Sequence, residues 1–201
     1  MTEPELDNPK QLVASYFAED TESVARNLLG ALLLRRINEQ WIGGRIVETE
    51  AYLHEHDLAS HSARGKGNSN AAMFAEPGTI YVYPIHAKVC FNVVTQPENV
   101  GAAVLVRALE PIWGIDVMET HRGLTTPTRL TSGPAMLCQA LAIDRSFNGR
   151  HFTDEPRLML CQNHVSTEFD IVASPRIGIS KSVDLPLRFF IKDNRFVSRR
   201  K

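Results

Sequence analysis

Gly44-Arg45-Ile46-Val47-Glu48-Thr49-Glu50-Ala51-Tyr52 is the stretch that decides the fold of this chain. Side chains alternate between the two faces of a strand, so Glu48, Glu50 and Tyr52 would share one face. A carboxylate beside an aromatic ring suits a site that stacks a flat ring and activates a water molecule. The same alternation is equally typical of a half-buried edge strand with solvated glutamates, and both interpretations stand at this point.

The residues around this stretch predict one α+β domain. Residues 32–37 and 41–52 read as two strands of a hairpin that turns around Asn38-Glu39. Asp20 or Thr21 is placed to cap a helix. Residues 54–72 show neither helical nor strand periodicity and are expected to form a loop. Further strands are expected at 79–83, 89–95, 103–108 and 186–192, with helices at 112–121 and 135–142. Mostly antiparallel strands with peripheral helices fit a single domain.

Composition narrows the class of protein. The chain has 201 residues, of which 43% are hydrophobic and 22% charged, as in an ordinary soluble domain. No apolar run approaches the roughly 20 residues of a membrane span, and the acidic start lacks a signal region, so export is not expected. Residues 1–15 are expected to be a loose acidic leader before one domain at 16–201. The three cysteines form no CxxC pair, which favours reduced thiols inside the cell.

Charge is distributed unevenly along the chain. The formal net charge is −1, yet residues 1–23 carry −5 and residues 176–201 carry +6. A basic end allows one positive face even in a nearly neutral protein, and nucleic acid is the partner that such a face attracts. Alternatively, residues 199–201 only keep the chain in solution.

Five blocks of sequence, taken in order, resemble the alkyladenine (3-methyladenine) DNA glycosylase family. They are 44–52 with His61, 73–74 with 77–83, 104–111, 132–134 and 137–141. Together they extend over roughly residues 16 to 192. The resemblance implies a curved, open barrel-like antiparallel sheet with peripheral helices. It also implies excision of damaged purines from duplex DNA.

The resemblance assigns roles to two charged residues. Cleavage of an N-glycosidic bond places positive charge on the sugar in the transition state, so a carboxylate is needed to stabilise the cation and deprotonate water. The family match selects Glu50 for this role, whereas spacing alone does not separate it from Glu48. Arg107 matches the arginine expected to hold the water and orient Glu50. A structural ion pair is its alternative role.

The resemblance also implies a pocket for an extruded base. Tyr52, His61 and Tyr83 match the family's aromatic walls, and electron-rich walls favour a cationic alkylated purine. Asn92 matches an asparagine that resists guanine's amino group, with a turn-stabilising amide as its alternative role. Here the chain departs from the family: His86 stands where an intercalating tyrosine is usual, and the path to Asn92 looks one residue shorter.

Several residues are expected to contact DNA. His86 is the expected wedge in the duplex. The backbone at Ser132-Gly133-Pro134, ahead of the helix at 135–142, could bind a phosphate, with an ordinary helix start as the alternative. The expected DNA contacts are His86, Arg64, Lys88, Ser132, Gly133 and Arg188, with Arg195 as a further representative of the basic end. His54, His56 and His61 also suggest zinc, but no cysteine lies nearby and the family works without metal, so neither a metal nor another cofactor is expected.

The leading hypothesis is a monofunctional DNA glycosylase of base excision repair that leaves an abasic site. A damage-binding module without catalysis and a nucleoside hydrolase are the alternatives; Glu50 with Arg107 argues against the first, and the lack of an Asp-rich cluster argues against the second. The expected partner is damaged double-stranded DNA, bound by a monomer away from membranes. We expect a cytoplasmic, nucleoid-associated protein in a bacterium and a nuclear one otherwise. Preference among 3-methyladenine, 7-methylguanine, hypoxanthine and ethenoadenine stays open.

Overall fold

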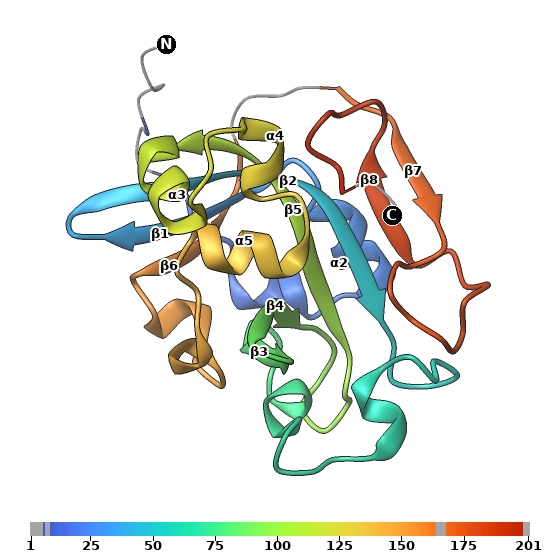
Figure 1. The fold of residues 1–201 in the computed structure, drawn as a ribbon. Coiled ribbons are helices and arrows are strands. Elements are labelled where there is room, and N and C mark those ends of the chain that lie inside the picture. The colour runs from blue at the N-terminus through green and yellow to red at the C-terminus, as the bar shows by residue number, and fades with distance from the viewer. Residues whose placement is uncertain (1–5, 7–8, 164–167, 199–201) are drawn as a thin grey trace.

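Two long strands, β2 (Gln40–Tyr52) and β5 (Ala103–Trp113), pair at the centre of the sheet (Figure 1). The computed structural model describes residues 6, 9–163 and 168–198. Eight strands form one open antiparallel sheet in the order β3-β4-β5-β2-β1-β6, and β8 joins both β2 and β7. The other strands are β1 (Leu32–Ile37), β3 (Ile80–Ile85), β4 (Lys88–Val94), β6 (Leu158–Cys161), β7 (Ile171–Ser174) and β8 (Arg188–Ile191). The expected α+β class and antiparallel sheet are confirmed.

The helices are short and lie around the sheet (Figure 1). They are α1 (Ala14–Phe17), α2 (Thr21–Asn27), α3 (Ile115–Arg122), α4 (Pro127–Leu130) and α5 (Pro134–Ala140). Single 3₁₀ turns are η1 (His61–Arg64), η2 (Ala71–Phe74), η3 (Arg145–Phe147) and η4 (Phe152–Asp154). The N-cap of α2 is Asp20, whose carboxylate accepts a 3.0 Å hydrogen bond from the Ser23 N–H, as the sequence predicts.

The hairpin of β1 and β2 turns at the predicted residues. Asn38 and Glu39 have φ of 46° and 68°, and Ile37 pairs with Gln40 across this two-residue turn. Positive φ at both central residues gives a turn whose twist matches that of the flanking strands. Farther along β2, Gly44 lies against β5 so closely that a Cβ would meet the Glu110 carbonyl oxygen at 1.9 Å. No larger residue fits there.

Several element boundaries differ from the prediction. The helix predicted at 112–121 begins only at Ile115, because β5 continues to Trp113 and Gly114 turns the chain in the left-handed region. The short strands β6 and β7 and the single turn α4 were not predicted, since four residues are too few to show a period. The predicted loop at 54–72 contains η1 and the first two residues of η2.

Strand β2 is a central strand, so the edge-strand alternative is wrong. Its first half pairs with β1 and its second half pairs with β8, while β5 covers its other edge. The register with β5 shifts around Glu48, where Val47 and Arg107 have no direct partner across the two strands. Such bulges redirect side chains and are frequent beside active sites. Glu48 and Glu50 are fully buried.

Helix α2 covers the face of the sheet opposite the glutamates. The Thr49 hydroxyl donates a 2.8 Å hydrogen bond to the Ala25 carbonyl, which places the Thr49 side of β2 against α2. Apolar side chains from this face and from β4 and β5 form the main core with α2 and α5. Burial of this apolar area supplies the dominant favourable term in folding. The opposite face of β2 is thereby left for polar groups.

The ends of the chain are described only in part. Lys10 and Leu12 exchange backbone hydrogen bonds with Gln162 and Leu160, so this part of the expected loose leader is joined to the sheet. Two parts of the expected ends lie outside the described residues: 1–5, 7 and 8 of the leader, and the basic end at 199–201. All three cysteines are free and buried. Across 6, 9–163 and 168–198, no helix has the length and apolar character to cross a bilayer.

Candidate active site

A cavity of about 310 Å³ opens beside the carboxyl end of β2. That volume matches the lower end of ordinary small-molecule sites. Its walls combine aromatic, apolar and polar side chains from the sheet, from η1 and from the 175–182 segment that precedes β8. The lining includes Tyr52, Leu58, His61, Arg64, Met73, Tyr81, Tyr83, Ile85, Cys90, Asn92, Leu105, Gly178, Ile179, Ser180 and Lys181. The four residues expected to contact a base, Tyr52, His61, Tyr83 and Asn92, are all among them.

Two aromatic groups from distant parts of the chain form one wall. His61 of η1 and Tyr83 of β3 have ring centroids 3.9 Å apart with planes inclined by 42°. His61 Nδ1 lies 2.9 Å from the Tyr81 hydroxyl, which anchors the imidazole to the sheet. Tyr52 reaches the cavity separately, from the end of β2. The cavity is therefore lined by flat rings from three elements, η1, β3 and β2.

The charge of the His61 wall matters for a cationic ligand. Burial lowers the pKa of His61 below its ordinary value, and the nearby positive charge of Arg64 lowers it further. Both causes favour the neutral imidazole. A neutral imidazole offers a flat stacking surface without repelling a positively charged ring.

Asn92 of β4 is a buried polar residue in the cavity lining. Its Nδ2 donates a 2.9 Å hydrogen bond to the Tyr81 carbonyl, and 7% of the residue is exposed. The bond crosses from β4 to β3 and fixes the carboxamide in place. Cys90, two residues earlier, also lines the cavity, and burial raises the pKa of its thiol to about 11. Cys90 therefore contributes a neutral, space-filling group.

Glu50 lies behind the cavity wall and is held by three groups. It accepts a 2.9 Å hydrogen bond from the Tyr52 hydroxyl and a 2.8 Å hydrogen bond from the Ile177 N–H. The Arg107 Nη1 lies 3.2 Å from Glu50 Oε2. Glu50 itself is 0% exposed, so Tyr52 is its direct connection to the cavity.

The environment of Glu50 affects its proton affinity in two directions. Burial raises the pKa of Glu50 above its ordinary value, and this is the largest effect. The Arg107 charge, the Ile177 N–H and the Tyr52 hydroxyl lower it, while the charge of Glu48 raises it. A carboxylate with a raised pKa beside an arginine can accept a proton from water.

Glu48 belongs to the same buried network as Glu50, because Arg107 pairs with both carboxylates. It accepts hydrogen bonds from Arg107 Nε at 3.0 Å, Arg188 Nε at 2.6 Å and the Ser198 N–H at 2.7 Å. With Glu50, this gives two buried carboxylates and two buried guanidinium groups. Removal of one member of such a set leaves an uncompensated buried charge. Glu48 thus holds Arg107 and anchors the last described residues of the chain.

Arg188 does not lie where a phosphate contact was expected. Arg188 is only 6% exposed, and its guanidinium also donates to the Ser174 hydroxyl and the Ser198 carbonyl. The basic composition of the C-terminal segment suggested an exposed position, but β8 pairs with β2 and turns this side chain inward onto Glu48. The DNA interface that we propose therefore omits Arg188. Arg195 is exposed and remains in it.

The start of α5 differs from the expected phosphate site. Gly133 is buried, and its N–H already donates to the carbonyls of Arg107 and Thr131. Ser132 forms a β-bridge with Ala108, next to the Arg107 bulge. Gly133 thus bonds the backbone at Arg107 with the N–H group that an anion would need.

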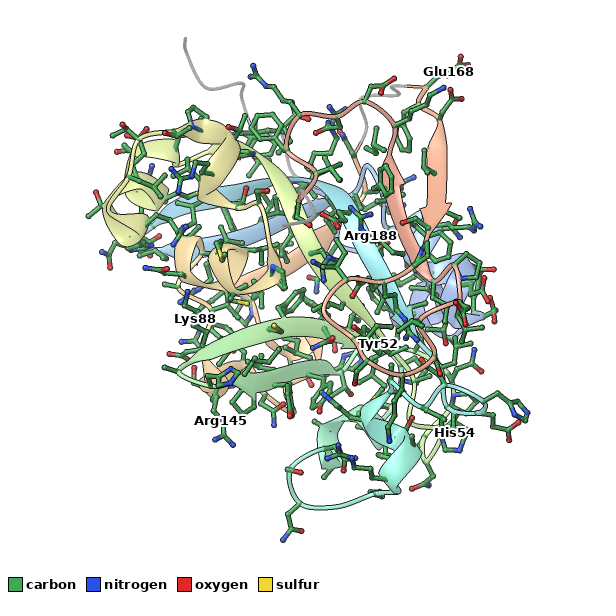
Figure 2. The ribbon with its side chains drawn as sticks, turned by 45° about the vertical axis from the view of Figure 1, so that its right-hand side comes forward. Tyr52, His54, Lys88, Arg145, Glu168 and Arg188 are labelled. Atoms are coloured by element: carbon green, nitrogen blue, oxygen red, sulfur yellow. The ribbon has the colours of Figure 1, made fainter. Side chains whose placement is uncertain are left out.

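The remaining expected DNA contacts lie on the surface. His86 and Lys88 are exposed at the tip of the β3–β4 hairpin, and His86 has φ of 54°. Figure 2 shows Lys88 at the outer end of this hairpin, while Tyr52 and Arg188 lie among the central strands. Ile85, 45% exposed, lies on the same tip and also lines the cavity. Arg64 is exposed at the cavity rim.

The histidines considered as zinc ligands have other contacts. His54 Nδ1 accepts a hydrogen bond from the Gly101 N–H, and His61 Nδ1 pairs with Tyr81. His56 is exposed beside Glu55. Within the described ranges, no group of three or more histidine, cysteine, aspartate or glutamate side chains is placed to bind one ion.

Sequence reasoning missed the 175–182 segment and its partner Asp57. Ile177 supplies a backbone N–H to Glu50, and Gly178 to Lys181 line the cavity. Arg176 forms a buried ion pair with Asp57 and lies over the Tyr52 ring. The segment lies 125 residues or more beyond Glu50 in the chain, so no local spacing brings the two together.

The Tyr52 hydroxyl joins the aromatic cavity to a buried carboxylate–arginine pair, an arrangement typical of enzymes that bind a flat ring and activate water. Comparison with known sequences narrows this class. A family model described as Methylpurine-DNA glycosylase (MPG) matches residues 15–195, and the chain belongs to this family. Membership makes it a DNA glycosylase, a hydrolase in DNA repair.

Curated relatives extend over nearly the whole chain. A protein of Rhodopirellula baltica is 50% identical over 194 residues, which cover 94% of this chain and 83% of the relative. One from Carboxydothermus hydrogenoformans is 45% identical and one from Methanoculleus marisnigri 47% identical, each over 94% of this chain and 99% of its own length. All three carry the name "Putative 3-methyladenine DNA glycosylase".

Proposed function

We propose that this enzyme flips alkylated or deaminated purines out of duplex DNA and hydrolyses their N-glycosidic bond, leaving an abasic site. The observation that carries the proposal is the link between cavity and carboxylate: Tyr52 lines the cavity with its ring and donates its hydroxyl to Glu50. A base stacked on Tyr52 therefore brings its sugar next to the Glu50–Arg107 pair.

Recognition begins with extrusion of the base. A base inside a duplex must leave the stack to reach an enclosed cavity, at a cost of a few kcal/mol that is smaller for damaged or mispaired bases. Tyr52 stacks on one face of the extruded purine, and the His61–Tyr83 wall stacks on the other. Electron-rich rings attract a cationic alkylated purine, and a neutral His61 does not oppose it. Asn92, which lines the cavity, contacts the base edge.

Bond cleavage then requires a base and charge stabilisation. The ionised Glu50 accepts a proton from water as the oxygen attacks C1′, and the C1′–N bond breaks with its electron pair leaving on the purine. Positive charge that develops on the sugar is stabilised by the same carboxylate. Arg107, 3.2 Å from Glu50, orients the carboxylate and the water. Entry of the sugar and water requires Glu50 to become accessible from its buried position.

DNA approaches along the surface that carries the hairpin tip and the rim of the cavity. His86 enters the duplex in place of the extruded nucleotide, with Lys88, Arg64 and Arg195 contacting phosphates. All four side chains are exposed, as such contacts require. Phosphate contacts fix position and contribute salt-dependent affinity without reading sequence.

One assay tests this function. Purified protein is incubated with duplexes that each contain one defined lesion, with EDTA present, and abasic sites are revealed by alkaline cleavage. Excision that needs alkali for strand cleavage and persists in EDTA supports the proposal. Binding of the lesion duplex without excision would favour the damage-binding module. Release of the base from free nucleosides but not from duplex DNA would favour the nucleoside hydrolase.

The same assay separates hydrolysis from a lyase mechanism. Lys181 lines the cavity and is exposed, so an amine is present at its rim. A lyase would form a Schiff base that borohydride traps as a covalent protein–DNA adduct. The monofunctional mechanism predicts that the wild-type protein forms no adduct. It also predicts that the excision rate of Lys181→Met lies within about tenfold of the wild-type rate.

A further inference from the structure

The Asp57–Arg176 ion pair is the most enclosed charged contact beside the cavity. Both side chains are 0% exposed. Arg176 Nη1 lies 2.6 Å from Asp57 Oδ2, and Arg176 Nη2 lies 2.6 Å from Asp57 Oδ1. This two-point geometry fixes the orientation of the guanidinium as well as its distance. Neither residue lines the cavity, so contact with a bound ligand does not explain why two charges are buried here.

The ion pair joins two loops that both contribute residues to the cavity lining. Asp57 also accepts hydrogen bonds from the Leu53 and Ala59 N–H groups, which shapes the loop after β2. Arg176 Nη1 donates 3.0 Å to the Ala51 carbonyl at the end of β2. The Leu58 N–H donates to the Ser182 hydroxyl at the other end of the 175–182 segment. The 175–182 segment is thereby held near its start by the end of β2 and at its last residue by the loop after β2.

Arg176 packs against Tyr52 and directly precedes the residue that binds Glu50. Its guanidinium carbon lies 4.6 Å from the centroid of the Tyr52 ring, and Arg176 itself is not part of the cavity lining. It therefore packs against the Tyr52 ring without itself lining the cavity. The next residue, Ile177, donates its backbone N–H to Glu50 at 2.8 Å.

We propose that the Asp57–Arg176 ion pair is a positioning device that holds the Ile177 N–H on Glu50 and the Tyr52 ring in the cavity wall at the same time. This inference rests on the proposed function, because that function assigns Glu50 and Tyr52 their roles. Arg176 and Asp57 are positioning residues that act through Ile177 and Tyr52. A misplacement of about 1 Å at a reacting group can reduce a rate about a hundredfold.

Loss of the ion pair has a specific consequence for Glu50. The Ile177 N–H and the Tyr52 hydroxyl each lower the pKa of Glu50, so their displacement raises that pKa further. The other titratable or charged groups around Glu50 come from four strands: Glu48 on β2, Arg107 on β5, Cys90 on β4 and Arg188 on β8. Loss of the ion pair is expected to leave these groups in place. Since Glu50 works ionised, a higher pKa moves the acidic limb of the pH–rate profile to higher pH.

The test measures single-turnover excision against pH with a duplex that contains 7-methylguanine. This lesion already carries a positive charge, so its departure needs no protonation and the acidic limb reports the enzyme. Asp57→Asn and Arg176→Gln should each raise the midpoint of that limb by at least about half a unit and slow excision about tenfold. The charge-neutral double variant should do the same without a lone buried charge. Glu110→Gln, which breaks the Arg45 ion pair at the far end of β2 and β5, should leave the midpoint unchanged.

An unchanged midpoint in folded variants overturns the positioning role. Should every variant fail to fold by circular dichroism, hydrogen exchange on the wild-type protein decides. The Ile177 amide is then expected to exchange as slowly as core amides, and fast exchange contradicts the proposal. Failure of the proposed function looks different: Glu50→Gln would retain excision, or the wild type would show no acidic limb at all.

Discussion

The Tyr52 hydroxyl lies 2.9 Å from Glu50 Oε2, so a residue that lines the cavity is bonded directly to the carboxylate proposed to activate water. Two residues apart on one strand, the two side chains share a face. Burial raises the pKa of the Tyr52 phenol, which keeps it protonated and therefore a donor. Recognition of a flat ring and activation of water thus share one hydrogen bond.

Glu50→Gln should abolish excision while damaged-duplex binding persists. The amide keeps the size of the carboxylate but cannot accept a proton from water, so single-turnover excision should fall by at least about a hundredfold. A gel-shift titration with the same lesion checks that binding is retained. Excision within about tenfold of wild type would remove Glu50 from the proposed role.

Glu48→Gln should mainly destabilise the protein. Glu48 is fully buried and pairs with Arg107 and Arg188, so its substitution is not a mild control for Glu50→Gln. Breaking such a network typically costs about 3–5 kcal/mol, measured as a lower midpoint of urea unfolding. Glu39→Gln removes an exposed ion pair with Arg36 and should change stability by less than about 1 kcal/mol. Equal stability of both variants would contradict the network.

Tyr52→Phe should move the acidic limb of the pH–rate profile to higher pH. The ring remains for stacking, while loss of the hydroxyl removes a hydrogen bond that lowers the pKa of Glu50. A higher pKa leaves less of the ionised base at a given low pH. Binding of the damaged duplex should stay near wild type for Tyr52→Phe and weaken for Tyr52→Ala. A midpoint that stays in place would mean that the hydroxyl does not act on Glu50.

His86→Ala should impair excision from duplex DNA more than from single strands. A wedge stabilises the flipped duplex by filling the vacated space, and a single strand has no such gap. Ile85→Ala is the matched comparison, because Ile85 is 45% exposed on the same hairpin tip and lines the cavity. Equal losses on both substrates for His86→Ala, with a duplex-specific loss for Ile85→Ala, would transfer the wedge role to Ile85.

Arg195→Gln and Arg64→Gln should each reduce the salt dependence of duplex binding. Neutralising one phosphate contact weakens all duplexes alike and reduces the slope of log affinity against log salt by about one. Arg188→Gln should leave this slope unchanged and lower stability instead, because Arg188 pairs with buried Glu48. A reduced slope for Arg188→Gln would return it to the DNA interface.

Local sequence rules determined the elements whose signals lie within a few residues. The β1–β2 hairpin follows from alternating side chains around Asn38-Glu39, and the start of α2 follows from Asp20. Resemblance to the family located Glu50 and the aromatic residues that line the cavity. These features depend on neighbours in the chain or on ordered blocks of sequence, and both are visible without coordinates.

Tertiary structure alone decided which charged residues are buried and which contacts hold the site. Arg188 reads as basic surface in the sequence, yet strand pairing turns it onto Glu48. The pairing of Asp57 with Arg176 joins residues 119 positions apart. A bulge places Arg107 between both carboxylates. The physical reason is that burial and long-range ion pairs depend on how strands and loops meet in space, which no local period encodes.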